Sequence, residues 1–182
     1  LISSVNTPER AVIGLITELD IDGGFNPVTG QATPPWFVME MIRQLYDVRR
    51  VDITSSSIDE DVDILMIVHP QELSDGMLYA IDQHVMKGGQ AIVFLDPNAD
   101  SLVTRSPQGA MIPAGMGSDL EVLLSAWGVE YQDDKVLADN ELALRVRMSQ
   151  NGRPMPHLSM VGVPRENFDQ EDIITSRLET VN

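Results

Sequence analysis

The stretch from Asp61 to Pro97 most constrains what this chain can fold into. It contains two apolar runs, Ile64–Val68 and Ala91–Leu95, and neither run alternates with polar residues. Such runs are typical of strands that are buried on both faces of a parallel sheet. Between them, apolar residues recur at the three- and four-residue spacing of one helix face. These residues are Met77, Leu78, Ile81 and Val85. The stretch therefore predicts a strand–helix–strand unit.

Start and stop signals for this helix stand at both of its ends. Ser74 is a suitable N-cap, and the carboxylate of Asp75 favours the positive end of the helix dipole. Lys87 lies in the last turn, and Gly88 can adopt the left-handed conformation that often ends a helix. We therefore expect the helix to run between Ser74 and Gly88.

The preceding part of the chain predicts two further strands and a helix. Residues 10–17 form a short apolar run, which we interpret as the first strand, and a long loop rich in Gly, Pro and Asp follows it. A helix is expected over 35–46, with an apolar face. Its members are Val38, Met41, Ile42 and Leu45. Residues 47–53 predict a short strand at an edge of the sheet, because polar residues interrupt it.

The part of the chain after Pro97 carries weaker signals. A second long loop extends to about Gly117, and the S-x-x-E spacing of Ser118 and Glu121 predicts a capping box at the start of another helix. The helix should end near Gly128. Short strands are expected beyond it. They are Val129–Tyr131, Val136–Ala138, Ala143–Met148 and Leu158–Val163, with a turn at Asn151-Gly152.

This alternation of strands and helices predicts an α/β fold. We expect an open, mostly parallel, doubly wound sheet with helices on both faces in residues 1–132. A β-rich extension over residues 133–182 is expected to pack on this core and not to fold independently.

Composition excludes several classes of function. The formal net charge of −16 argues against binding to nucleic acid or to anionic lipid surfaces, both of which need a basic footprint. The absence of cysteine excludes disulfides, thiolate metal sites and a cysteine nucleophile. No apolar run of about 18 residues is present, so we expect no membrane span within these residues.

Four polar residues are candidates for a ligand cleft, because ligands of such sheets bind at the carboxyl ends of the strands. They are Glu18, Asp20, His69 and Asp96. A Ser-His-Asp hydrolase would need a G-x-S-x-G nucleophile elbow, and the sequence has none. We therefore favour a structural role over a catalytic one at His69 and Asp96, and we predict no catalytic residue.

Motifs for metals and cofactors are incomplete. The segment from Asp20 to Asn26 has Gly24 and Phe25 where a calcium loop needs a ligand and a glycine, which favours a solvated turn. The chain has no G-K-[ST] phosphate loop and no H-E-x-x-H spacing. We therefore expect neither a resident metal nor a cofactor.

The central stretch also resembles a known family. The string IDQHVMKGGQAIVFLDP, which ends at Pro97, is its most specific part, and DILMIVHP from Asp63 to Pro70 precedes it. Weaker blocks are Pro35-Trp36, Trp127-Gly128-Val129 and the final DIITSRLETVN. Together these resemble the auxiliary, non-ATPase component of an ABC-type transport system associated with gliding motility (GldG-like proteins).

The resemblance implies an extracytoplasmic (periplasmic) domain of a membrane-anchored protein that works beside an ABC ATPase and a permease. It implies a flavodoxin-like or glutamine-amidotransferase-like fold without the catalytic cysteine of that enzyme class. It supplies no catalytic residues. We also expect the sequence to be a piece of a longer protein whose flanking transmembrane helices lie outside it.

Two functions from different classes follow. The first is a non-catalytic domain that binds transporter subunits or an extracytoplasmic ligand. The second is a hydrolase-like or sugar-binding domain that uses the strand-end cleft around His69 and Asp96. The missing catalytic set favours the first.

Overall fold

A computed structural model describes residues 10–26, 30–99, 103–105, 111–113, 117–132, 134–147 and 152–181. The chain divides into two compact units, Leu1–Asp133 and Asp134–Asn182, and we describe each by itself. That the second unit depends on the first for folding stays a prediction.

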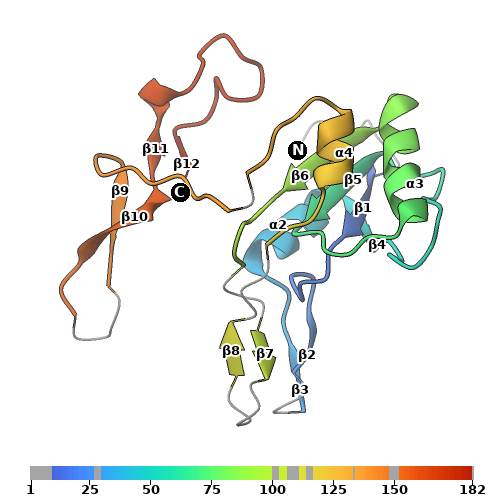
Figure 1. The fold of residues 1–182 in the computed structure, drawn as a ribbon, viewed down its shortest axis with the longest axis horizontal. Helices are drawn as coiled ribbons and strands as arrows, with labels where there is room; N and C mark the ends of the chain where they lie inside the picture. The colour runs from blue at the N-terminus through green and yellow to red at the C-terminus, as the bar shows by residue number, and fades with distance from the viewer. Residues whose placement is uncertain are drawn as a thin grey trace. The chain divides into compact units, whose positions relative to one another are not determined.

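A four-stranded parallel sheet forms the centre of the first unit (Figure 1). Its strands are β1 (Val12–Ile16), β4 (Asp47–Arg50), β5 (Ile64–Val68) and β6 (Gln90–Phe94), in the order β4-β1-β5-β6. This order equals the first four strands of the flavodoxin-like arrangement, in which the chain reverses direction across the sheet between β1 and its neighbour. The predicted fold class is confirmed, and β4 lies at an edge as expected.

Helices cover both faces of this sheet because side chains alternate along its two central strands. Val12, Ile16, Leu65 and Ile67 point to one face, where α3 (Asp75–Met86) and α4 (Glu121–Ala126) complete the larger core cluster. Ile13, Leu15 and Met66 point to the other face, where α2 (Phe37–Leu45) contributes Met39. The sheet is therefore doubly wound.

Helix α3 begins and ends as the sequence predicts. The Ser74 hydroxyl accepts a hydrogen bond from the Met77 backbone N–H at 3.2 Å, which satisfies one of the free donors of the first turn. Gly88 follows the helix with φ +91°, a conformation that costs a glycine little. These local interactions need no distant partner, which is why the sequence alone located them.

The buried face of α2 differs from the predicted one. Met39 is fully buried and Ile42 is half-buried, whereas Val38, Met41 and Leu45 are exposed. The helix carries apolar residues around more than half of its circumference, so the apolar pattern alone does not identify the core-facing side.

Strand β6 also differs from the prediction, because it is not buried on both faces. It forms an edge of the sheet, and Ile92 and Phe94 are about half exposed. The register pairs Ile92 with Met66 and Phe94 with Val68, so both exposed side chains lie on the face that α2 covers only in part.

Each of the two long loops contains a short antiparallel hairpin that was not predicted. Strands β2 (Gly24–Asn26) and β3 (Gln31–Thr33) lie in the first loop, and β7 (Val103–Arg105) and β8 (Met111–Pro113) lie in the second. The loops leave β1 and β6 at their carboxyl ends, and Figure 1 shows both hairpins projecting on the same side of the sheet. Val129–Tyr131 forms no strand, and the Tyr131 ring packs against the larger core cluster.

The second unit consists of two small antiparallel sheets. One pairs β9 (Ala143–Val146) with β10 (Met155–Val161), and the other pairs β11 (Val163–Pro164) with β12 (Thr180–Val181). A 3-10 helix, Arg165–Asn167, follows β11. The predicted strand Val136–Ala138 is absent. Asn151, half of the predicted turn between β9 and β10, lies outside the described residues.

Candidate functional site

The carboxyl edge of the parallel sheet brings together segments that are distant in sequence. His69 follows β5, Asp96 comes soon after β6, and Glu18 comes soon after β1. Because the strands are parallel, all three residues lie toward the same edge of the sheet, where ligands of doubly wound folds bind.

His69 and the backbone of Asp96 meet at the hydroxyl of Ser118. The His69 Nδ1 atom lies 3.0 Å from Ser118 Oγ, and His69 is only 2% exposed. Ser118 Oγ accepts a hydrogen bond from the Asp96 backbone N–H at 2.9 Å and lies 3.2 Å from the Asp96 carbonyl oxygen. We call this set of three residues the Ser118 junction.

The hydroxyl of Ser118 has one proton to share between two acceptors. If it donates to the Asp96 carbonyl, the His69 Nδ1 atom must carry a proton and donate to Ser118. If it donates to His69, the proton of the neutral imidazole lies on Nε2. In either state the His69 Nε2 atom is buried and has no hydrogen-bond partner among the described residues.

Further hydrogen bonds connect the segments that meet at this edge of the sheet. The His69 N–H donates to the Phe94 carbonyl at 2.9 Å, and the Asp119 N–H donates to the Pro70 carbonyl at 2.7 Å. The Gln71 side-chain amide donates to the Gly117 carbonyl at 3.3 Å. The segments after β5 and β6 are thus tied to the segment before α4, and His69 keeps a strained φ of +47° within this network.

The capping-box interpretation of Ser118 is wrong. The N-cap of α4 is Leu120, and no side chain caps that helix. Ser118 instead uses its hydroxyl for His69 and Asp96, because strand pairing brings those residues within reach.

The carboxylate of Asp96 does not face His69. Its Oδ1 atom accepts a hydrogen bond from the Asn98 backbone N–H at 2.9 Å, and the residue is exposed. A Ser-His-Asp triad needs the carboxylate on the histidine. The hydrogen bonds around Ser118 therefore hold neighbouring segments together and do not form a catalytic triad.

Glu18 lines a separate open hollow of about 520 Å³ at the ends of β1 and β4. Asp52 lies in the same hollow, and its carboxylate accepts hydrogen bonds from the Thr54 hydroxyl at 2.7 Å and from the Thr54 backbone N–H at 2.9 Å. These bonds stabilise the ionised form and lower the pKa of Asp52 below its usual value.

Arg50 supplies the positive charge of this hollow, but its guanidinium is already engaged. It donates to the Leu19 carbonyl at 2.8 Å and to the Asp22 carboxylate at 2.9 Å. Asp20 is exposed, and its side chain lies so close to Gly24 that a Cβ there would be 2.8 Å from its Oδ1 atom. No hydrogen bond or ion pair among the described residues joins Asp20 or Glu18 to His69.

The structure thus places the four candidate residues in different settings. His69 and the Asp96 backbone share the Ser118 junction, whereas Glu18 lies in the hollow and Asp20 lies on the exposed loop. Sequence reasoning missed Arg50 and Asp52, because the predicted strand ran on to residue 53, whereas β4 ends at Arg50 and so places both residues at its carboxyl end.

Within its described ranges the chain holds neither a candidate metal site nor a candidate membrane span. No group of three His, Asp or Glu residues in the described ranges is arranged to hold a metal ion. No helix among the residues described here is both long and apolar enough to cross a bilayer.

The fold and this edge define a doubly wound α/β domain whose strand-end histidine is buried in a hydrogen-bonded junction. Residues 10–182 match the model of the auxiliary family described as "ABC-type uncharacterized transport system", and the chain belongs to that family. Searches of curated proteins and of solved structures gave no match. The membership confirms the transport-system part of the resemblance and makes other components of an ABC system its expected partners.

Proposed function

We propose that this chain is a non-catalytic accessory domain that contributes a protein-binding surface to an ABC-type transport system. Membership of the auxiliary family supports the link to an ABC-type transport system. The observation that carries the binding role is an apolar stripe on the solvent side of α2.

The stripe consists of Phe37, Met41 and Leu45, which stand four residues apart and so share one helix face. Phe37 is 75% exposed and Leu45 is 70% exposed, whereas Met39 on the opposite side of the same helix is fully buried. The stripe therefore is not needed to attach α2 to the sheet.

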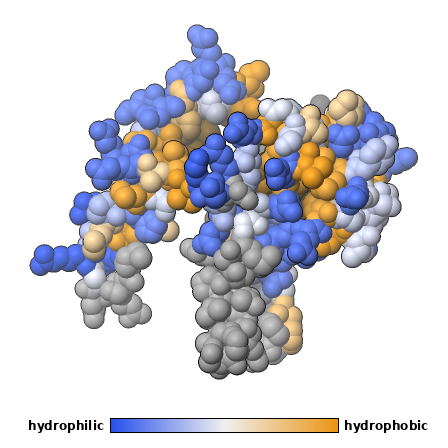
Figure 2. All heavy atoms as spheres, viewed as in Figure 1, coloured by the Kyte–Doolittle hydropathy of each residue, from blue (hydrophilic) through white to orange (hydrophobic). Residues whose placement is uncertain are grey.

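The same sheet face remains partly uncovered beyond α2. Ile92 and Phe94 of the edge strand β6 are half exposed there. Contiguous apolar groups on a protein surface often mark a contact with another protein, and aromatic and Met residues are enriched in such contacts. Figure 2 shows the face that carries α3 and α4, where apolar residues lie between many polar ones.

The setting of His69 supports a non-catalytic role. Its ring is buried against Ser118, and the Asp96 carboxylate is turned to the Asn98 amide. The alternative, a hydrolase-like or sugar-binding domain that uses His69 and Asp96, receives less support because His69 is only 2% exposed.

The partners we propose are the ATPase and permease subunits of the same system. The resemblance to GldG-like proteins extends the proposal to a system associated with gliding motility and to an extracytoplasmic position of this domain.

Co-purification followed by native mass spectrometry tests this function. The full protein is expressed with the permease and ATPase of its system, as wild type and as Leu45→Glu. The control is Val122→Glu, which adds the same charge at an exposed apolar residue of α4, on the other face of the sheet. A residue at the centre of an interface costs about 2 kcal/mol or more when disrupted, so Leu45→Glu should weaken association by about 30-fold or more.

Two results would count against the proposal. Association that Leu45→Glu and Phe37→Glu leave unchanged would show that the stripe is not the contact. Failure of the wild type to associate at any salt concentration would reject the accessory role itself.

A further inference from the structure

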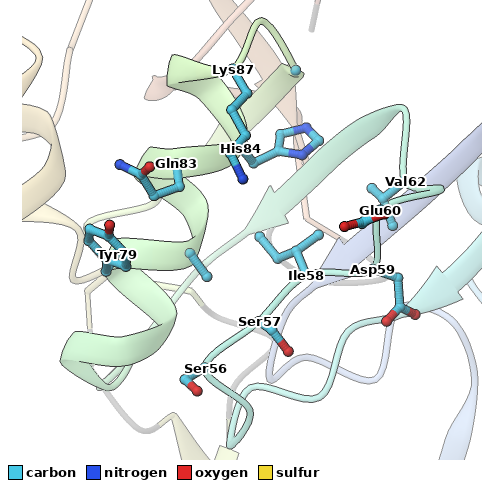
Figure 3. Close-up of a pocket in the computed structure, with 12 residues that line it drawn as sticks. Ser56, Ser57, Ile58, Asp59, Glu60, Val62, Tyr79, Gln83, His84 and Lys87 are labelled. Carbon is cyan, nitrogen blue, oxygen red and sulfur yellow. The ribbon is translucent and has the colours of Figure 1, made fainter.

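A second hollow, remote from the strand ends, lies between α3 and the loop that precedes β5. Its volume is about 550 Å³, within the range of small-molecule sites. Figure 3 shows Tyr79, Gln83, His84 and Lys87 on the helix side and the segment from Ser56 to Val62 on the loop side. We call this hollow the α3 cleft.

The floor of the cleft is apolar and fixed. Val62 is buried in the larger core cluster, and Ile58 and Ala80 pack against that cluster. Gly76 allows close approach of the two walls, because a Cβ there would lie 2.8 Å from the Ser56 Cβ. The cleft therefore has a preformed base suited to a small aliphatic group.

The rim carries charges of both signs. Lys87 lies on the helix wall, and Asp59 and Glu60 lie on the loop wall. None of the ion pairs found among the described residues involves these three side chains. The ammonium of Lys87 and the carboxylates of Asp59 and Glu60 line the same hollow without forming an ion pair, so all three charges are available to a ligand.

His84 is held in place beside Lys87. Its Nε2 atom lies 3.3 Å from the Gln90 carbonyl oxygen, so in the neutral ring this nitrogen carries the proton and Nδ1 is the acceptor. A Cβ at Gly89 would overlap the His84 ring, so the ring occupies space that only a glycine leaves free.

We propose that the α3 cleft binds a small zwitterion, namely a free amino acid or a short peptide. The ligand carboxylate lies at Lys87, its amine lies at Asp59 and Glu60, and its aliphatic part covers the Ile58 floor. The overall charge of −16 disfavours a purely anionic ligand, whereas a zwitterion adds no net charge. This inference is independent of the α2 stripe.

An NMR titration of the whole chain tests the proposal with the dipeptide alanyl-leucine as the probe. Binding on the order of millimolar Kd should shift the backbone amide signals of residues 56–62 and 84–89. N-acetylation of the probe removes its positive charge, and C-terminal amidation removes its negative charge. Each change should weaken binding about two- to fivefold, as expected for an exposed ion pair.

Variants locate the site. Lys87→Gln and Glu60→Gln should each weaken binding about two- to fivefold. Lys135→Gln is the matched control, because Lys87 and Lys135 are the two lysines of the chain and Lys135 lies in the other unit. Unchanged signals from the remaining core would show that each variant is folded.

Three outcomes would overturn the proposal. The first is no shift at these amides with saturating dipeptide. The second is an equal response to the acetylated, amidated and free probes, which would mean apolar adsorption. The third is a response of the cleft to glucose but not to the dipeptide, which would assign the cleft to neutral sugars.

Discussion

Removal of the Ser118 hydroxyl provides the sharpest test of the junction at the strand ends. In Ser118→Ala the Asp96 N–H loses its acceptor, and His69 Nδ1 loses its partner. His69 is buried, and the Asp96 bond is partly buried, so water does not fully replace either interaction. An unsatisfied buried polar group costs about 1–3 kcal/mol, and the partly buried Asp96 N–H contributes at the low end of that range, so the two together should lower the free energy of unfolding by about 2–4 kcal/mol.

Urea unfolding monitored by tryptophan fluorescence measures this loss. Both tryptophans, Trp36 and Trp127, belong to the first unit, so their signal reports the unit that contains the junction. With a urea dependence of about 2 kcal/mol per molar, the midpoint should fall by about 1–2 M. Ser125→Ala is the control, since Ser125 is an exposed serine on α4, and it should change stability by less than about 0.5 kcal/mol.

A double-mutant cycle separates the junction from a general loss of packing. His69→Asn is a suitable partner variant, because asparagine tolerates a positive φ better than most residues. If Ser118 and His69 act together, the double variant should cost at least about 0.5 kcal/mol less than the sum of the single variants. Equal effects of Ser118→Ala and Ser125→Ala, or strict additivity with His69→Asn, would refute the reasoning.

Two further predictions concern the core and the charged hollow. Ile81→Ala truncates a fully buried residue of α3 and should lower the free energy of unfolding by about 2–5 kcal/mol in the same urea assay. Val122→Ala, on the exposed side of α4, is the control and should have little effect. Equal losses in the two variants would contradict the assignment of Ile81 to the core. NMR titration of the Asp52 carboxyl should give a pKa below the usual value of about 3.8, and Thr54→Val should raise that pKa. Because the pKa is lowered in the folded state, any stability from this contact is present above the unfolded pKa and is lost as the pH falls through the folded pKa. A pKa of Asp52 that Thr54→Val leaves unchanged would contradict the assigned cause.

The parts of the fold that sequence patterns predicted are those set by local interactions. Helix α3 needs only its own cap at Ser74 and the glycine at position 88, and its two flanking strands are continuous apolar runs. These features required no knowledge of distant partners.

The parts that escaped prediction depend on distant contacts. The Ser118 capping box failed because the Ser118 hydroxyl is engaged by His69 and Asp96, which are distant in sequence. The core face of α2 was misassigned because the sheet covers only Met39 and Ile42 of a largely apolar helix. The hairpins escaped notice because a three-residue strand such as Gln31–Thr33 is too short to show an alternating pattern.

The two hairpins give this domain a way to diversify. Both follow the carboxyl end of a parallel strand, and no described side chain of the β2–β3 hairpin belongs to the buried clusters that hold the sheet together. Changes in the length or sequence of this first hairpin therefore alter the rim of the strand-end edge without disturbing the core. An exchange of that hairpin would therefore reshape the strand-end rim while the sheet and its helices stay the same.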